Sequence, residues 1–364
     1  MDFKIVNALT PEQIQEWDHF VEEAPHSHIF QTYPWGQFQK IYSGREVLYF
    51  SGAENGKTKV LGQIFKKQWP RVPLFNYEMP FGPVFHDAVD YAAALKYLDG
   101  ALKGSAVTLD IGPRWPIEYY ERFSEICRER GFKPRRDPRE EGYPNETVWV
   151  DLRRPLAEIL AGFRYTTRYE IRRAERNGIE VSMGTDAAML EQFYGFYQGQ
   201  MAHRQWPPTE KRFFDSLLSH FLSDSRRGII AVARHGEQVL SAAIFYRLGP
   251  MVWYTFGASD MSQKKNQDTT HLLHWKVMEY FKGQGCAWYD FSGAYPKLPL
   301  DDPGYGVNVF KTGFSKHFVR FTPRFAKDYR PSLVRLMKMR RRVNDLRLFV
   351  SGKVYAYSRR LRPF

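Results

Sequence analysis

The 364-residue sequence contains only two cysteines, Cys127 and Cys286, and neither belongs to a CxxC pair. So few and so widely separated cysteines are typical of a reducing compartment and exclude a disulfide framework and a cysteine-ligated zinc. The ten histidines show no ligand spacing beyond His271 and His274, which lie at i, i+3 on a predicted helix and are expected to have no partner carboxylate nearby. We therefore expect no bound metal ion.

Long hydrophobic runs are also missing. The best candidate, residues 239–246, ends at Arg247 and is far shorter than a membrane span. The first residues, MDFKIVNALTPEQIQEW, lack the basic and apolar segments of a signal peptide. We expect a cytoplasmic protein. GxSxG, Walker A and GxGxxG motifs do not occur, which argues against hydrolase, NTPase and Rossmann functions.

Aromatic and other apolar residues are plentiful. The chain has 28 Phe, 22 Tyr and a hydrophobic fraction of 43%, so it can form packed cores. Its length is typical of two domains. The helical period predicts helices at 11–24, 88–102, 116–130, 155–162, 164–176, 186–202, 209–222 and 269–283, and alternation predicts strands at 45–51, 58–66, 106–111, 147–152, 229–234, 239–248 and 251–256.

Three features recur at nearly the same spacing. Ile64-Phe65 returns 180 residues later as Ile244-Phe245, and Leu109-Asp110-Ile111 returns 180 residues later as Tyr289-Asp290-Phe291. Gly131-Phe132 and Gly313-Phe314 are 182 residues apart. Coincidence between two α/β segments is the alternative, but equal spacing favours a duplicated α/β domain with a mixed sheet. We place the domains at 1–153 and 154–329, followed by a tail at 330–364.

Positive charge is concentrated in that tail. Residues 330–364 carry eleven Lys or Arg and one acid, so they account for +10 of the net charge of +13. A basic tail on a nearly neutral body indicates a polyanionic partner such as RNA or an anionic membrane, or simply a solvated helix. Its apolar stripe either lies on a membrane or packs on the first domain; the stripe comprises Leu333, Leu336, Val343, Leu346 and Val350.

The stretch 289–314 is the strongest candidate for a site. A strand ends at Asp290, a Ser292-Gly293 turn follows, and after a Pro- and Gly-rich loop the chain reaches Lys311. Such an arrangement commonly holds an anionic or carbonyl group near backbone donors. Asp290 and Asp110 either accept a proton from an attacking amine or cap the following turn; for Asp110 we favour the cap.

A second basic segment, residues 164–176, interleaves five arginines with Tyr165 and Tyr169. Their spacing places most of the arginines on one helix face, which fits RNA phosphate binding. A solvated face paired with Glu170 and Glu175 fits almost as well. The arginines are Arg164, Arg168, Arg172, Arg173 and Arg176.

The element order is similar to that of acyl-coenzyme A N-acyltransferase (GNAT) domains. Their pyrophosphate loop is glycine-rich and lies at a helix N-terminus. Here the corresponding loop, SDMSQKKNQDTT, has no glycine after Gly257, so coenzyme A would be poorly held.

Five segments together resemble the FemABX family of aminoacyl-tRNA-dependent transferases: Phe30-Gln31 with Trp35 and Lys40, Gly82-Pro83, residues 168–178, Tyr289 to Gly293, and Phe310 to Phe314. The resemblance implies two tandem GNAT-like domains. It also implies transfer of an amino acid from aminoacyl-tRNA to an amine of a peptidoglycan precursor, either lipid II or UDP-MurNAc-pentapeptide. The basic tail would touch the inner membrane face, and no cofactor would be needed. No 40-residue heptad run occurs, so the long coiled-coil arm of some members is not expected.

The resemblance also implies residue roles. Lys40, with Arg204 or Arg212, would bind the precursor's pyrophosphate. Lys311 would lie near the aminoacyl-tRNA 3′ end and stabilise the oxyanion, with Asp290 and Phe310 beside it. The remaining substrate-binding candidates are Trp35, Tyr254, Tyr289 and Gly293. An acyl-coenzyme A-dependent N-acyltransferase and a non-enzymatic RNA- or membrane-binding scaffold are the alternatives.

Overall fold

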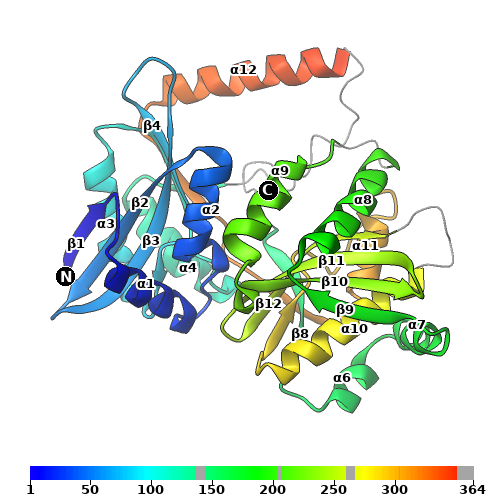
Figure 1. Ribbon diagram of the computed structural model, residues 1–364. Helices are drawn as coiled ribbons and strands as arrows, with labels where there is room; N and C mark the ends of the chain where they lie inside the picture. Colours follow the sequence, from blue (N-terminus) through cyan, green and yellow to red (C-terminus); the bar gives the residue numbers. More distant parts are fainter. Residues whose placement is uncertain (136–143, 204–206, 260–266, 303, 351–364) are drawn as a thin grey trace. The chain divides into compact units, whose positions relative to one another are not determined.

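The computed structural model describes residues 1–135, 144–203, 207–259, 267–302 and 304–350. The chain divides into two compact units, coloured along the sequence in Figure 1. Unit 1 comprises Met1–Tyr143 and Phe321–Phe364, and unit 2 comprises Pro144–Arg320.

Unit 1 is built on one mixed sheet with helices on both faces. Its sheet has the order β1-β2-β3-β4-β6-β15-β7, with β5 beside β3, and only β4 and β6 are parallel. The elements are β1 (Asp2–Val6), α1 (Pro11–Glu23), η1 (Ile29–Gln31), α2 (Tyr33–Ser43), β2 (Glu46–Glu54), β3 (Lys57–Gln68), β4 (Phe75–Pro80), β5 (Val84–Phe85), α3 (Ala88–Leu102), β6 (Ala106–Gly112), η2 (Ile117–Tyr119), α4 (Tyr120–Glu129), β7 (Lys133–Pro134), β15 (Phe325–Asp328) and α12 (Pro331–Val350).

Side-chain alternation in β2 explains the two layers of helices. Leu48 and Phe50 join the core cluster formed with α3. Tyr49 points to the opposite face, where its ring lies 5.4 Å from that of Trp17 on α1. Successive side chains of a strand alternate between faces, so both sides of this sheet are apolar and both are covered.

Unit 2 repeats this architecture. Its sheet has the order β14-β8-β13-β12-β11-β10-β9, and only β12 and β13 are parallel. The elements are β8 (Glu146–Asp151), α6 (Leu156–Gly162), α7 (Tyr165–Arg176), β9 (Glu180–Gly184), α8 (Ala187–His203), α9 (Lys211–Leu217), η3 (Leu218–Leu222), η4 (Ser225–Arg227), β10 (Gly228–His235), β11 (Gln238–Leu248), β12 (Met251–Ser259), α10 (Gln267–Gly283), β13 (Trp288–Asp290), α11 (Tyr305–Lys311) and β14 (His317–Arg320).

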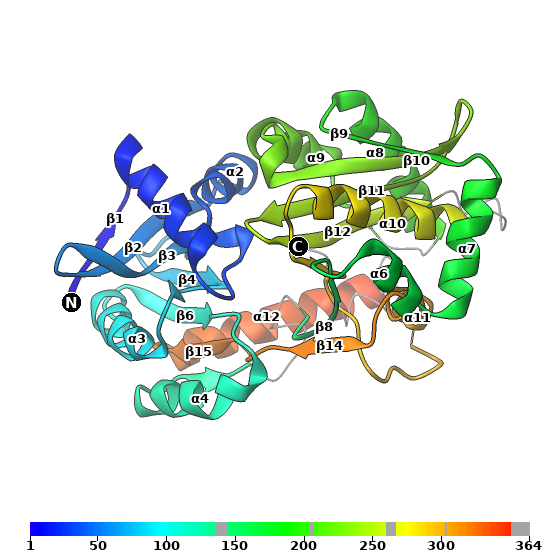
Figure 2. The ribbon, with the colours of Figure 1, turned by 90° about the horizontal axis from the view of Figure 1, so that it is seen from below.

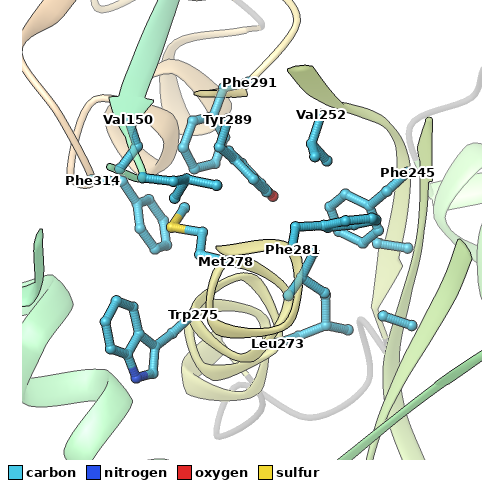
Figure 3. Close-up of a cluster of buried hydrophobic side chains, with 14 of the residues drawn as sticks. Val150, Phe245, Val252, Leu273, Trp275, Met278, Phe281, Tyr289, Phe291 and Phe314 are labelled. Atoms are coloured by element: carbon cyan, nitrogen blue, oxygen red, sulfur yellow. The ribbon is translucent and has the colours of Figure 1, made fainter. Parts of the chain in front are cut away.

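Helices α8 and α9 cover one face of this second sheet, and α7 and α10 cover the other (Figure 2). The core on the α10 side is rich in aromatic rings. Figure 3 shows Trp275, Met278 and Phe281 of α10 in one cluster with Tyr289, Phe291 and Phe314. Within the described part of unit 2, α8 and α10 are the longest helices at 17 residues each, so no long coiled-coil arm is present there.

The duplicated fold is confirmed by the order of the elements. In unit 1 the chain runs β2, β3, β4, α3 and β6, and in unit 2 it runs β10, β11, β12, α10 and β13. The helix in each run connects the two parallel strands. Asp110 lies in β6 and Asp290 ends β13, so the recurring strand ends occupy equivalent positions.

The unit boundaries differ from the predicted ones because the two units exchange a strand. Strand β8, predicted to end the first domain, pairs with β13 and β14 in the sheet of unit 2. Residues 325–328, which fall at the end of the predicted second domain, form β15, and this strand pairs with β6 and β7 in the sheet of unit 1. The divisions therefore fall at 143/144 and 320/321 rather than after 153 and 329.

The basic tail starts on unit 1. Arg330 donates to the carbonyl of Gly104 at 2.7 Å, and Val334 in the first turn of α12 is buried. Beyond it, Leu336 and Met339 are more than half exposed. Of the predicted apolar stripe, Val343, Leu346 and Val350 have side chains outside the described residues. Along the described chain, every helix is too short or too polar to span a lipid bilayer.

The exchanged strand gives a stability prediction. Phe325 of β15 is fully buried in the core of unit 1. We expect Phe325→Ala to lower the free energy of unfolding by about 3–5 kcal/mol, measured by urea denaturation, because it leaves a cavity. Leu300→Ala, at a side chain that is 81% exposed, is the control and should change little. A loss below about 1 kcal/mol for Phe325→Ala would show that β15 is not needed by unit 1.

Candidate active site in unit 2

The parallel strands β12 and β13 part in the middle of the sheet. They pair from Met251 opposite Trp288 to Trp253 opposite Asp290, and there β13 ends while β12 continues to Ser259. Among the described residues no strand pairs with this edge of β12 after Trp253. We call this point the strand opening. The ends of parallel strands that part from each other are the usual ligand sites of α/β sheets.

The equivalent place in unit 1 is closed. Strands β4 and β6 stay paired as far as Pro80 opposite Gly112, and the amide of Gly112 then donates to the carbonyl of Gly82 at 3.0 Å. Gln31 adds to this closure, because its side chain donates to the Pro80 carbonyl and accepts from the amide of Gln63 in β3, each at 2.6 Å. In unit 1 the pairing of the parallel strands therefore continues two residues past Asp110, whereas in unit 2 it ends at Asp290.

At the strand opening the chain turns sharply around Asp290, which is fully buried. Its carboxylate accepts from the Thr147 hydroxyl of β8 at 2.5 Å and from the Ser292 amide at 2.7 Å. The amide of Gly293 donates to the same Thr147 hydroxyl at 3.1 Å. Asp290 therefore caps the turn. The amides of Ser292 and Gly293, expected to hold an anion, are already engaged.

Gly293 is required for this turn. It has φ +100°, a conformation that side chains disfavour, and a Cβ added there would lie 2.8 Å from Cγ of Pro144. The turn leaves the carbonyls of Ser292 and Gly293 available as acceptors.

Lys311, at the end of α11, uses those carbonyls. Its Nζ donates to the carbonyl of Ser292 at 3.2 Å and to that of Gly293 at 2.8 Å, and the side chain is only 9% exposed. The ammonium group also lies 5.6 Å from the ring centroid of Tyr254 in β12. Burial lowers the pKa of Lys311 to about 8, and the charge of Asp290 partly offsets this effect. An ammonium has three donors, so one remains after both carbonyls are satisfied.

A neutral histidine lies beside this lysine. His274 of α10 is fully buried, and its Nδ1 shares a hydrogen bond with the hydroxyl of Tyr289. Its Nε2 has no hydrogen-bond partner among the described residues. Burial holds the pKa of His274 well below its usual range, and the charges of His271 and Lys311 lower it further. A charged imidazole would repel the Lys311 ammonium, so this neutral state lets both groups coexist.

Most of the predicted residues of the second domain meet at the strand opening. Besides Lys311, Asp290 and Gly293, Tyr254 is partly buried there with its ring 4.5 Å from that of His274. Phe310 is also partly buried, and its ring lies 5.2 Å from that of His274. Tyr289 is completely buried in the core shown in Figure 3, so it positions His274 and does not face a substrate.

The other predicted residues lie elsewhere. Trp35 of α2 is 4% exposed and stacks on Phe30 at 4.2 Å, so it supports α2 from inside the core. Lys40, in the last turn of α2, is exposed. Arg212 is exposed on α9, on the sheet face opposite α10, and pairs with Glu210 at 2.5 Å. Arg204 lies outside the described residues.

Asp110, the counterpart of Asp290, has a different environment. It forms ion pairs with Arg135 at 2.5 Å and with Arg324 at 3.1 Å. Burial raises the pKa of Asp110, and the two arginines partly offset this rise. Arg324 precedes β15, so in unit 1 this carboxylate fastens the exchanged strand instead of capping a turn.

Thr147 and His274 were not identified as functional from the sequence. Thr147 meets Asp290 only because β8 pairs with β13, which lies some 140 residues further along the chain. No local pattern reveals such a contact. His274 was predicted to be an ordinary packing or surface residue. Only the structure shows that it bonds to Tyr289 and lies near the charge of Lys311. The described residues contain no group of three or more metal-ligating side chains.

Comparisons with known proteins agree with this fold. Residues 161–305 match the family model described as "Acetyltransferase (GNAT) domain". The chain is 23% identical over 266 residues to UDP-N-acetylmuramoylpentapeptide-lysine N(6)-alanyltransferase of Weissella viridescens, covering 70% of this chain and 77% of the relative. It is 20% identical over 368 residues to lipid II:glycine glycyltransferase of Staphylococcus epidermidis, covering 82% and 87%.

Among solved structures, the crystal structure of FemX superposes with a TM-score of 0.80 at 18% identity, covering 92% of this chain and 99% of FemX. The fold and the relatives define an acyltransferase with two GNAT-like units. The chain is similar in sequence to Fem-type transferases over most of its length, and its fold is that of FemX.

The pKa of Lys311 gives a prediction for the pH profile. If the ammonium form is the active one, transferase activity should fall as the pH rises above about 8, because Lys311 then loses its proton. Lys311→Met should lower kcat by about 10²–10³ and remove this fall. Lys311→Arg, which stays charged, should also lack it. Lys316→Met, at an exposed lysine nearby, is the control. A fall near pH 8 that persists in Lys311→Met would assign it to another group.

Asp290 allows a second test of the same assignment. Asp290→Asn keeps an oxygen that accepts from Thr147 and Ser292 but removes the negative charge that raises the pKa of Lys311. The fall in activity should therefore begin at lower pH than in the wild type. A profile unchanged in position would mean that Asp290 does not influence the titrating group.

Proposed function

We propose that the protein transfers an aminoacyl group from aminoacyl-tRNA to an amine of a peptidoglycan precursor, at the strand opening of unit 2. The observation that carries the proposal is the buried Lys311 ammonium at the end of α11, beside the parted strands β12 and β13. The names of the relatives support the acceptor class: one acts on a UDP-N-acetylmuramoylpentapeptide and the other on lipid II.

The chemistry is aminolysis of an ester. The acceptor nitrogen forms a bond to the aminoacyl carbonyl carbon, the carbon–oxygen bond to the ribose breaks, and the ribose oxygen receives the proton lost by the amine. The ester is already activated, so the enzyme has to orient the reactants, exclude water and stabilise the negative oxygen of the tetrahedral intermediate.

Lys311 suits the last of these tasks. Two of its donors are fixed by the carbonyls of Ser292 and Gly293, so the remaining donor has a defined direction. Asp290 acts as a positioning residue, since it holds the turn that carries both carbonyls and keeps Lys311 protonated. We assign Tyr254 to substrate contact and Phe310 to the wall of the donor site.

For unit 1 we propose that Lys40 binds the pyrophosphate of the precursor. Its side chain is exposed and has no ion pair among the described residues. A lysine of this kind contacts phosphate as a point charge. In unit 2, Arg212 is the described candidate for a second phosphate contact, although its ion pair with Glu210 would have to open.

Acyl-coenzyme A is the alternative donor. The match of residues 161–305 to a GNAT domain favours it, because this region includes the strand opening. The glycine-poor loop at 259–270 argues against it, and most of that loop lies outside the described residues.

Mass spectrometry of the acceptor distinguishes the two donors. The purified protein would be incubated with UDP-linked or lipid-linked muramyl pentapeptide and either aminoacyl-tRNA or acetyl-coenzyme A. We expect the acceptor to gain the mass of one aminoacyl residue from tRNA only, and Lys311→Met to lose this gain while Lys316→Met keeps it. A gain from acetyl-coenzyme A without one from tRNA would overturn the proposed donor.

A further inference from the structure

Helix α7 exposes a continuous stripe of aromatic and basic side chains. Thr167, Ile171 and Ala174 form its buried face. On the opposite face, at spacings of 4, 3 and 4, lie four residues: Tyr165, which is 72% exposed, Tyr169, which is 45% exposed, and the exposed Arg172 and Arg176. Residues at such spacings lie in one row along a helix. We call this row the α7 stripe.

The acidic residues of α7 do not neutralise the stripe. Glu170 pairs with His271 at 2.8 Å and Glu175 pairs with Lys276 at 3.1 Å, so both are engaged with α10. The hydrogen bond from His271 lowers the pKa of Glu170, which keeps this acid ionised and turned to α10. Arg172 and Arg176 have no ion pair or hydrogen bond among the described residues.

Two of the five arginines serve a different purpose. Arg168 donates to the carbonyls of Ala161 and Phe163, at 3.0 and 2.5 Å. Arg164 donates to the Val309 carbonyl and the Thr312 hydroxyl, each at 3.3 Å. Most of the five arginines were predicted to share one face, but the outward row contains two arginines and two tyrosines, while Arg164 and Arg168 bind neighbouring groups.

Arg164 also connects the stripe to the strand opening. Its backbone amide donates to the Gly313 carbonyl at 2.7 Å, so the start of α7 is fixed to the residues that directly follow Lys311. Figure 2 shows α7 and α11 side by side at the margin of unit 2. The tyrosine end of the stripe is thus the end nearer to Lys311, and the arginine end is farther away.

From this geometry we infer that the α7 stripe binds the acceptor end of an RNA donor. The inference rests on the proposed function and assigns the partner's docking surface. Exposed tyrosines stack with unpaired bases, and arginines without acidic partners bind phosphates. The order along the helix fits an RNA whose single-stranded 3′ end passes the tyrosines towards Lys311, while its duplex lies at the arginine end of the stripe.

The length of the stripe fits as well. Eleven residues separate Tyr165 from Arg176, which corresponds to about 16 Å along the helix axis. At about 3.4 Å per nucleotide of a stacked strand, this distance covers about five nucleotides. A membrane surface is a weaker match, because the outward row carries no aliphatic side chain to insert among lipids.

The first test measures binding of deacylated tRNA by fluorescence anisotropy at several salt concentrations. Arg172→Gln with Arg176→Gln should weaken binding about tenfold and reduce the slope of log K against log salt by about two. The control pair, Arg122→Gln with Arg128→Gln, removes equal charge from exposed positions on α4 and should leave both values near the wild type. Unchanged binding in the α7 pair, or equal loss in both pairs, would overturn the inference.

The second test examines the tyrosines. Tyr165→Ala with Tyr169→Ala should weaken binding of intact tRNA about tenfold but change little for tRNA trimmed back to its duplex end. Equal loss for both RNAs would contradict stacking on the 3′ end. The variant Arg172→Gln with Arg176→Gln is also tested for binding to vesicles of anionic phospholipid. If this variant binds the vesicles more weakly than the wild type does but binds tRNA equally well, the stripe is a membrane surface and the inference fails.

Transfer activity separates this inference from the proposed function. If the wild type does not use aminoacyl-tRNA at all, the proposed function fails. If it does and the α7 variants transfer with wild-type kcat/KM, only the docking surface is wrong. With both correct, the Arg172→Gln with Arg176→Gln variant should lose kcat/KM for aminoacyl-tRNA and keep it for 3′-aminoacyl-adenosine, which has no phosphate for these arginines to bind.

Discussion

Burying an ammonium group is costly unless its donors find acceptors, and the arrangement around Lys311 depends on meeting this requirement. The acceptors are two main-chain carbonyls that face the same way only because Ser292 and Gly293 have positive φ. The Ser292-Gly293 turn depends on Asp290, whose carboxylate accepts a hydrogen bond from Thr147 of the neighbouring strand. Removing any of these residues disturbs the others, so the position of one charge is determined by three segments of the chain: Thr147, the turn from Asp290 to Gly293, and Lys311 itself.

The contrast between the two units shows how duplication allows specialisation. Both have a carboxylate at the same strand position, Asp110 and Asp290. In unit 1 the carboxylate binds two arginines and the parallel strands remain paired. In unit 2 the strands part and the carboxylate supports a turn. One sheet is therefore closed at this position, while the other has the opening at which we place the proposed site.

Local patterns predicted most of the elements. The helix predicted at 88–102 has those limits in the structure, because its apolar residues recur with the helical period and Asp87 caps its start. The recurrence of Asp110 at Asp290 predicted the duplication, since both residues lie in the second strand of a parallel pair, Asp110 within β6 and Asp290 at the end of β13. Lys311 was a candidate because it follows that strand end and its motif resembles the FemABX pattern.

Contacts between distant segments could not be predicted in this way. The pairing of β8 with β13, and with it the role of Thr147, depends on which sheet a strand joins, and alternation of apolar residues does not encode that choice. The directions of the arginine side chains on α7 could not be predicted from the sequence either. Helical spacing placed Arg168 near the basic face, yet nearby carbonyls bind it instead.

The exchange of β8 and β15 has a consequence for synthesis of the protein. Strand β15 lies between β6 and β7, so the sheet of unit 1 lacks an internal strand until residues 325–328 have left the ribosome. Domains of multidomain proteins generally fold in the order of their synthesis, the first one before the second is made. Here the sheet of the amino-terminal unit needs β15, which is synthesised after the whole of unit 2. The last strand of the second sheet, β14, therefore leaves the ribosome before the last strand of the first sheet, β15.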